Sequence, residues 1–200
     1  MRREPVPGLD ALNTPAKRNI KALTAEIASL SAGDLATATF SVARYGAFNI
    51  EGSVQFSATT GSVMLAGRAI DTSLKPEKSL QTLVTSGPGT VDAGGPGESA
   101  DGDSQAAQLT ASVRALEHGA IIHATFVEPA YGPFNVTGIC VAASVGDVFM
   151  VGSWFLSRHG VPAARLARLE ILASPGEHSL PIPAQITSWG DDAAAVSTDA

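Results

Sequence analysis

The chain has 200 residues, a formal net charge of −6 and one cysteine, Cys140. This length suits one domain or two small ones and is enough to bury a core without disulfides. One cysteine excludes an internal disulfide and a Cys-rich zinc site. The negative charge argues against a polyanion binder that acts through bulk charge, because counterion release requires a basic surface.

The sequence predicts neither a membrane span nor a signal peptide. The longest apolar runs are far shorter than the roughly 20 residues that a transmembrane helix needs, and the N-terminus has basic residues without an apolar segment. We therefore expect a cytoplasmic protein, or a virion component if the chain is phage-encoded, with no membrane partner.

Residues 1–16 predict a mobile N-terminal arm, because Pro and Gly are frequent there. Basic residues gather in and just after this arm, with few acidic residues opposing them. Such an arm suits contact with nucleic acid or an acidic partner, and the alternative is an ordinary solvated helix start. These residues are Arg2, Arg3, Lys17, Arg18 and Lys21.

A helix followed by strands is expected next. The i, i+3, i+7, i+10 spacing of Ile20, Leu23, Ile27 and Leu30 places them on one helix face. Alternating residues from 36 to 42 then indicate a half-buried strand. A Tyr-Gly turn leads into a second strand over 47–58, and a third strand is expected over 62–70. The stretch that begins at Pro76 predicts a turn and a short strand.

The chain matches itself at an offset of 86 positions. GDLATATFSVARYGAFNIEG (33–52) and GAIIHATFVEPAYGPFNVTG (119–138) are identical at nine of twenty positions. An internal repeat takes priority in predicting a fold. We predict repeat 1 over 17–86, an acidic Gly/Pro linker over 87–104, repeat 2 over 105–173, and a C-terminal extension over 174–200 that is disordered after about residue 190.

Each repeat resembles the SH3-like small β-barrels over about 55 residues, through GDLATATF, YGAFNIEG and PEKSLQTL and their second-copy equivalents. The predicted fold is mainly β: two antiparallel barrel or meander units, each preceded by a helix. An αβββα layout is the alternative, and the last segment of repeat 2 is open between strand and helix. The resemblance implies binding of peptides, proteins or nucleic acid, by fold analogy alone.

Repeat 2 is apolar where repeat 1 is polar. Ser41, Ser53, Gln55 and Thr59 are replaced by Val127, Ile139, Val141 and Val145, and a one-residue slip aligns Ala69 with Trp154. Strands that are apolar on both faces are typically buried on both sides. Either another part of the chain, such as the segment SLPIPAQITSW, covers this face, or the face is an interface with a partner or a second subunit. The candidate interface residues are Val127, Ile139, Val141, Val145 and Trp154.

The motif Tyr-Gly-x-Phe-Asn occurs in both repeats. One hypothesis makes each hairpin a contact platform, with Arg44 and Arg68 adding charge in repeat 1. The other is structural: glycine provides the turn, Phe fills the core and Asn fixes a strand end. The candidate ligand-contact residues are Arg44, Tyr45, Asn49, Tyr131 and Asn135.

Catalytic chemistry is not indicated. His118 and His123 have no acidic or Cys partner at ligand spacing, and Cys140 falls at an inward position where a buried thiol is expected. A nucleophile elbow and a phosphate-binding loop are both missing from the sequence. We expect no catalytic residue, cofactor or metal.

These features favour a non-enzymatic interaction or assembly module, as a scaffold or a phage-type structural protein. The alternative is a nucleic-acid-associated regulator that uses the basic arm and the hairpin tyrosines. A hydrolase is the third hypothesis.

Overall fold

The computed structural model describes Leu12 and residues 17–72, 75–93, 102–143, 148–157 and 165–187. We refer to residues 17–93 as the first half and to residues 102–187 as the second half. Every pairing between the strands is antiparallel, which confirms the mainly β, antiparallel class. Only two α-helices are described, α1 (Ile20–Ser29) and α2 (Gly102–Arg114).

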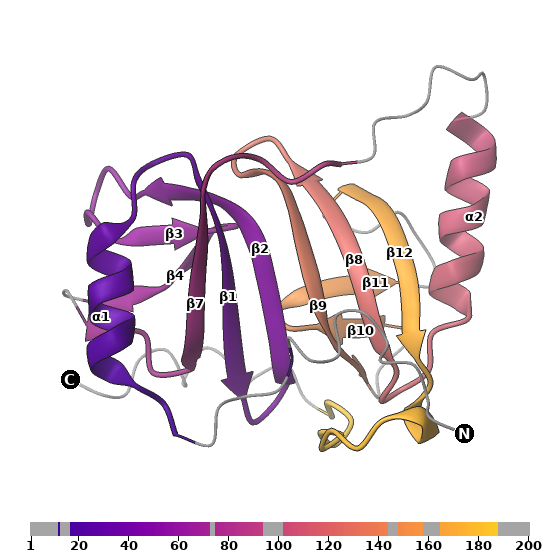
Figure 1. The fold of residues 1–200 in the computed structure, drawn as a ribbon. Helices are drawn as coiled ribbons and strands as arrows, with labels where there is room; N and C mark the ends of the chain where they lie inside the picture. Colours follow the sequence, from indigo (N-terminus) through magenta and orange to yellow (C-terminus); the bar gives the residue numbers. More distant parts are fainter. Residues whose placement is uncertain are drawn as a thin grey trace, which may run out of the picture.

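One ten-stranded sheet extends through both halves (Figure 1). Its six central strands lie side by side in the order β7 (Leu80–Pro88), β1 (Asp34–Val42), β2 (Gly46–Phe56), β9 (Gly132–Ala142), β8 (Ile121–Glu128) and β12 (Arg165–Ala173). Four shorter strands, β3 (Val63–Leu65), β4 (Arg68–Ala69), β10 (Val148–Val151) and β11 (Trp154–Ser157), lie behind them in Figure 1. A separate pair is formed by β5 (Asp71–Thr72) and β6 (Lys75–Pro76).

Of the predicted barrel or meander units, the barrel form is wrong. Among the described strands, none of the sheets closes on itself. The physical reason is the pairing of β2 with β9: each strand gives one edge to the other half, so each half remains open. The undecided last segment of the second half is a strand, β12. The ends of the predicted linker lie in β7 and α2, and its residues 94–101 lie outside the described residues.

The β2–β9 junction is built on phenylalanine facing glycine. Phe48 pairs with Gly138, and Ile50 pairs with Val136 at the centre. A Cβ atom at Gly138 would lie 2.7 Å from Phe48 Cβ, and one at Gly52 would lie 3.2 Å from Phe134 Cβ. The two glycines therefore allow the strands to approach with a phenylalanine over each of them.

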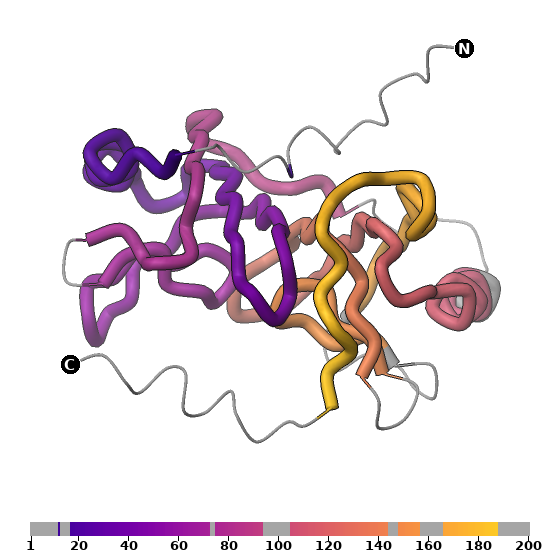
Figure 2. The backbone as a smooth tube through the Cα atoms, turned by 90° about the horizontal axis from the view of Figure 1, so that it is seen from below, coloured from indigo at the N-terminus to yellow at the C-terminus, as the bar shows by residue number. Residues whose placement is uncertain are grey.

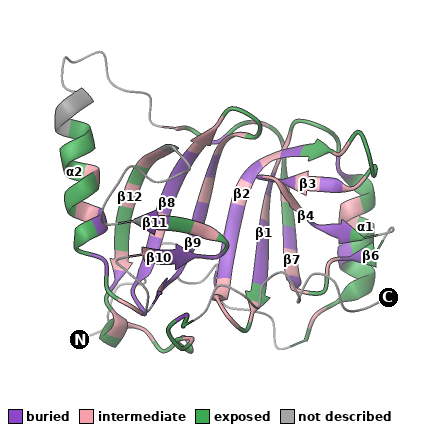
Figure 3. Ribbon diagram, turned by 180° about the vertical axis from the view of Figure 1, so that it is seen from behind, coloured by how far each residue is buried: buried purple, intermediate pink, exposed green. Residues whose placement is uncertain are grey.

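A single core lies on one face of this sheet. Phe40 stacks on Phe48 at 5.3 Å between ring centroids, and Phe126 stacks on Phe134 at 5.4 Å. Buried residues of both halves belong to this one cluster, and Figure 3 shows buried residues in purple on strands of both halves. Burial of apolar area at about 25 cal/mol per Å² is the main stabilising contribution that such a cluster makes.

The helices flank the two edges of the sheet. Asn19 caps the N-terminus of α1, and its Oδ1 accepts a hydrogen bond of 3.0 Å from the Ala22 N–H. Asn is a favoured N-cap residue because this bond satisfies an otherwise unpaired helix amide. α1 contacts β7 and β6, whereas α2 contacts β12. Leu23 and Val113 are buried at these contacts, so each helix covers one end of the core.

The predicted third strand is two strands. Between Leu65 and Arg68 the chain turns through Ala66 and Gly67, which have φ values of 49° and 76°. The equivalent turn of the second half pairs Val151 with Trp154 and has Gly152 at φ 54°. The residues of these two turns therefore correspond at an offset of 86 positions. The one-residue slip that aligned Ala69 with Trp154 is wrong.

The close approach at Gly138 generates a stability prediction. Gly138→Ala should lower the free energy of unfolding by about 1–3 kcal/mol, because overpacking forces the backbone or Phe48 to shift. Gly89→Ala is the matched control, since its nearest contact is Leu35 Cβ at 3.4 Å and nothing need move. Urea unfolding measures both variants. Equal effects of the two substitutions would contradict the junction described here.

Candidate functional site

The apolar outward face of the second half is covered by the chain's own C-terminal segment. Ile139 and Val141 are 1% and 0% exposed. They belong to a second buried cluster that includes Ile186 and Leu12. We call residues 174–187 the strap. We call the residues beneath it the floor: Ile121, Ile139, Val141, Ala143, Met150 and Ala173.

The strap reverses direction just after β12. In the short 3₁₀ helix Pro175–Glu177, the Ser174 N–H donates to the Glu177 carboxylate at 2.7 Å, and the Glu177 N–H donates to the Ser174 carbonyl at 2.9 Å. The first bond is the glutamate half of a capping box, and the second closes the 3₁₀ turn, so both amides are satisfied. The chain then passes through Pro181 and Pro183, which favour an extended backbone because proline fixes φ near −65°.

A parallel main-chain bridge between Ile186 and Ala143 holds the end of the strap on the sheet. In it the Ile186 N–H donates to the Ala142 carbonyl at 3.0 Å. Near the start of the strap, His178 Nε2 hydrogen-bonds the Gly119 carbonyl at 2.6 Å. The strap is therefore held near both ends, with Ile186 as its buried anchor at 5% exposure.

Glycines beneath the strap allow its apolar side chains to approach. A Cβ atom at Gly119 would lie 2.7 Å from Ile182 Cδ1, and one at Gly46 would lie 3.2 Å from Pro183 Cγ. Gly46 belongs to the first half, so the strap contacts both halves. Figure 2 shows the strap in yellow beside the β1–β2 turn in indigo.

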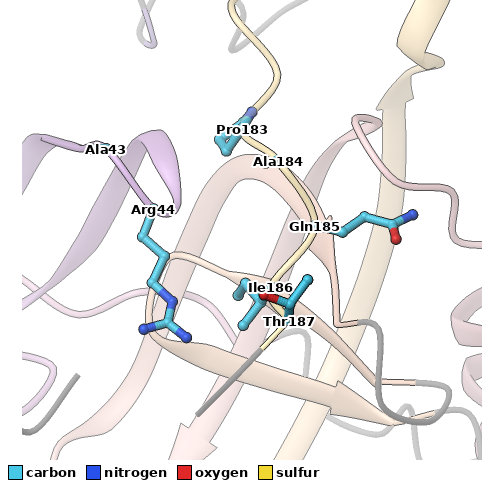
Figure 4. A pocket seen from close by; sticks show the side chains of 7 residues that line it. All are labelled: Ala43, Arg44, Pro183, Ala184, Gln185, Ile186 and Thr187. Carbon is cyan, nitrogen blue, oxygen red and sulfur yellow. The ribbon is translucent and has the colours of Figure 1, made fainter. Parts of the chain in front are cut away.

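A cavity of about 270 Å³ lies between the strap and the β1–β2 turn (Figure 4). Arg44 supplies the one charged side chain of its lining. The lining residues are Ala43, Arg44, Pro183, Ala184, Gln185, Ile186 and Thr187. The strap thus forms most of the wall of this cavity.

The structure does not bring the five candidate interface residues together. Only Ile139 and Val141 lie under the strap, while Val127 is half-buried in a different cross-strand row, paired with Pro133 and Arg165. Trp154 contacts the main core, 5.5 Å from the Phe134 ring and 6.5 Å from the Phe48 ring. Val145 lies outside the described residues.

Trp154 occupies the place that Arg68 has in the first half. The Arg68 guanidinium lies 4.6 Å from the Phe40 ring centroid and 5.6 Å from that of Phe48. It hydrogen-bonds Ser79 Oγ at 3.1 Å and lies 3.9 Å from Glu77. Burial lowers its pKa, opposed by the charges of Glu77 and Tyr45. The Arg68 cation is thus held against the core, with a quarter of its side chain exposed, and its role in a hairpin platform stays a hypothesis.

The asparagines of the two hairpins make the same bond inside the sheet. Thr39 Oγ1 donates to Asn49 Oδ1 at 2.7 Å, and Thr125 Oγ1 donates to Asn135 Oδ1 at 2.7 Å. Each bond joins neighbouring strands at directly opposite positions. These contacts correspond to the structural alternative for the motif, in which Asn fixes a strand.

The two tyrosines lie in different surroundings. Tyr45 packs against both buried clusters. Tyr131 is 36% exposed, and its ring lies over Gly67 of the first half, where a Cβ atom would come within 2.4 Å of Cζ. The two tyrosines therefore lie in unlike settings, and Tyr131 adds a contact between the halves.

Of the basic arm, Arg18 is bound within the fold. Its Nε donates to the Leu80 carbonyl at 2.6 Å, and Nη2 donates to the Glu77 and Pro76 carbonyls at 2.6 and 3.2 Å. Lys17 and Lys21 are exposed. Arg2 and Arg3 lie outside the described residues.

A row of polar residues crosses all six central strands on the face opposite the main core. Consecutive members are paired across neighbouring strands: Thr82, Thr39, Asn49, Thr137, His123 and Glu170. His123 Nδ1 hydrogen-bonds Thr137 Oγ1 at 2.7 Å. The sequence alone did not indicate this row, because it depends on the β2–β9 pairing between the halves.

Partial burial disfavours the charged form of His123. Its pKa is lowered mainly by desolvation; Arg168 lowers it further, while Glu170 and Glu51 oppose the shift. Cys140 is buried in the core, as expected for an inward position.

Comparisons with protein-family models, curated proteins and solved structures find no significant match to the chain. Within the described residues, there is no group of three or more His, Cys, Asp or Glu side chains that could hold a metal ion. Neither described helix has the length and apolar character needed to cross a membrane.

His123 generates a pH prediction. Because its pKa is lower in the folded state, the unfolded chain binds the proton more readily, and stability should fall as the pH drops below about 6.5. His123→Gln should reduce this slope, as measured by urea unfolding between pH 8 and pH 5. An unchanged slope would show that His123 does not contribute to it.

Proposed function

We propose that the protein is a non-enzymatic protein–protein interaction module whose binding surface is the floor, and that its ligand is an extended apolar peptide segment. The observation that supports this proposal is the strap itself. This segment of the chain itself lies on the floor. Its Ile186 side chain is buried there, and the Ile186 N–H donates to the Ala142 carbonyl. The strap is thus a template for the chemistry of a ligand.

The strap has the features of a peptide ligand. Its prolines reduce the entropy lost on binding, because the extended conformation is already favoured in the unbound segment. One backbone bond to a strand supplies directional affinity, and side chains entering apolar sites supply specificity. Most of the strap remains accessible, with Ile182 41% exposed, as in a bound peptide.

The nucleic-acid alternative has less support. It rests on the basic arm and the hairpin tyrosines, but Arg18 donates to three backbone carbonyls and Tyr45 packs against both buried clusters. The floor also suits a scaffold or assembly role better than catalysis, because all six of its side chains are apolar.

A labelled peptide tests the proposal on the full-length chain. The peptide has the sequence of residues 174–187, and the protein is Ile186→Asp, which weakens its own strap. Binding measured by fluorescence anisotropy should be about 10–100-fold tighter to Ile186→Asp than to the wild type, because a tethered strap competes at an effective concentration of about 1 mM.

The control peptide has Asp in place of Ile186 and should bind neither protein. Circular dichroism checks that Ile186→Asp is folded, and Ile186→Ser replaces it if it is not. A folded variant that does not bind the peptide at 1 mM would overturn the proposed function.

A further inference from the structure

We infer that the floor of one copy binds the strap of a second copy, so that the protein assembles by exchanging straps. This inference rests on the proposed function and names its partner. Every chain carries both a floor and a segment that fits it. The contacts that a second copy would make are therefore those already seen within one chain: Ile186 on Ala143, the Ile186 N–H on the Ala142 carbonyl, and His178 on the Gly119 carbonyl.

The connection between β12 and the strap is a suitable hinge. It consists of Ser174, Pro175, Gly176 and Glu177, and the hydrogen bonds of this turn join Ser174 and Glu177 to each other. Ser174, Gly176 and Glu177 are exposed, and a Cβ atom at Gly176 would meet nothing within 4 Å. Opening the turn breaks the bonds between Ser174 and Glu177, and releasing the strap breaks its bonds to the Ala142 and Gly119 carbonyls, while the strand pairings of the sheet remain.

The floor cannot remain uncovered at low cost. Ile139, Val141 and Met150 are at most 2% exposed with both the strap and Leu12 in place, and removal of the strap would transfer part of this apolar surface to water. A copy whose strap has left its floor consequently gains stability by accepting another strap. Domain swapping of this kind needs no new interface chemistry, because the same contacts form between chains.

Concentration decides between the closed and exchanged forms. A tethered strap acts at an effective concentration of about 1 mM, so the closed monomer should dominate at micromolar concentration. Exchange becomes favourable when copies are held together at comparable local concentration, as in an assembly, or when the chain's own strap is weakened. Reciprocal exchange closes a dimer, whereas one-way exchange continues as a chain.

Two full-length variants that complement each other test this inference. Ile186→Asp has a defective strap and an intact floor. Ala143→Glu has a defective floor at the bridge to Ile186 and an intact strap. If Ala143→Glu proves misfolded by circular dichroism, Val141→Gln takes its place.

Each variant alone should be monomeric at 100 µM by light scattering, at the chain mass of 20.4 kDa. An equimolar mixture should form a 1:1 heterodimer of twice that mass. A mixture that stays monomeric overturns strap exchange. If the labelled peptide still binds Ile186→Asp in that case, the proposed function stands without exchange; if the peptide also fails to bind, both are overturned.

Discussion

The pairing of β2 with β9 is the constraint on which the rest of the structure depends. Its register places Phe48 over Gly138 and Phe134 over Gly52, so each half supplies the ring that the other half's glycine admits. Because β2 and β9 give their edges to each other, neither half closes on itself, and one core forms behind both. Trp154 reinforces the junction by contacting Phe48 and Phe134 together.

The two halves share this frame but differ in what they add to it. In the first half, Arg68 lies over Phe40 and Phe48 with its cation near Glu77. The second half has Trp154 at the position equivalent to Arg68. The second half also has the apolar floor, on the opposite face of the sheet. A polar face needs no cover, but the floor does, and the strap provides it. The asymmetry therefore places the proposed binding surface in the second half.

Much of the fold could be predicted from local patterns. The helices, the main strands and their inward residues follow from 3.6- and 2-residue periodicities, which depend on the backbone alone. The apolar outward face at Ile139 and Val141 was also visible in the sequence, as was the segment that covers it. The pairing between halves was not predictable, because the polar and apolar alternation of β2 does not say which strand lies at its edge.

The wrong placement of Trp154 also comes from strand pairing that the sequence does not reveal. Trp154 was assigned to the outward face because a one-residue slip aligned it with Ala69, whereas strand register aligns it with Arg68. In a strand, a shift of one residue moves a side chain to the other face.

Native-state hydrogen exchange tests most directly the claim that the two halves form one unit joined at β2 and β9. The amides of Asn49 and Thr137, which are paired across the junction, should exchange with the same free energy of opening as the core amides of β1 and β8. Increasing denaturant should merge all of them into one global unfolding event. Two distinct opening free energies, with the junction amides exchanging first, would show that the halves unfold separately and would contradict this account.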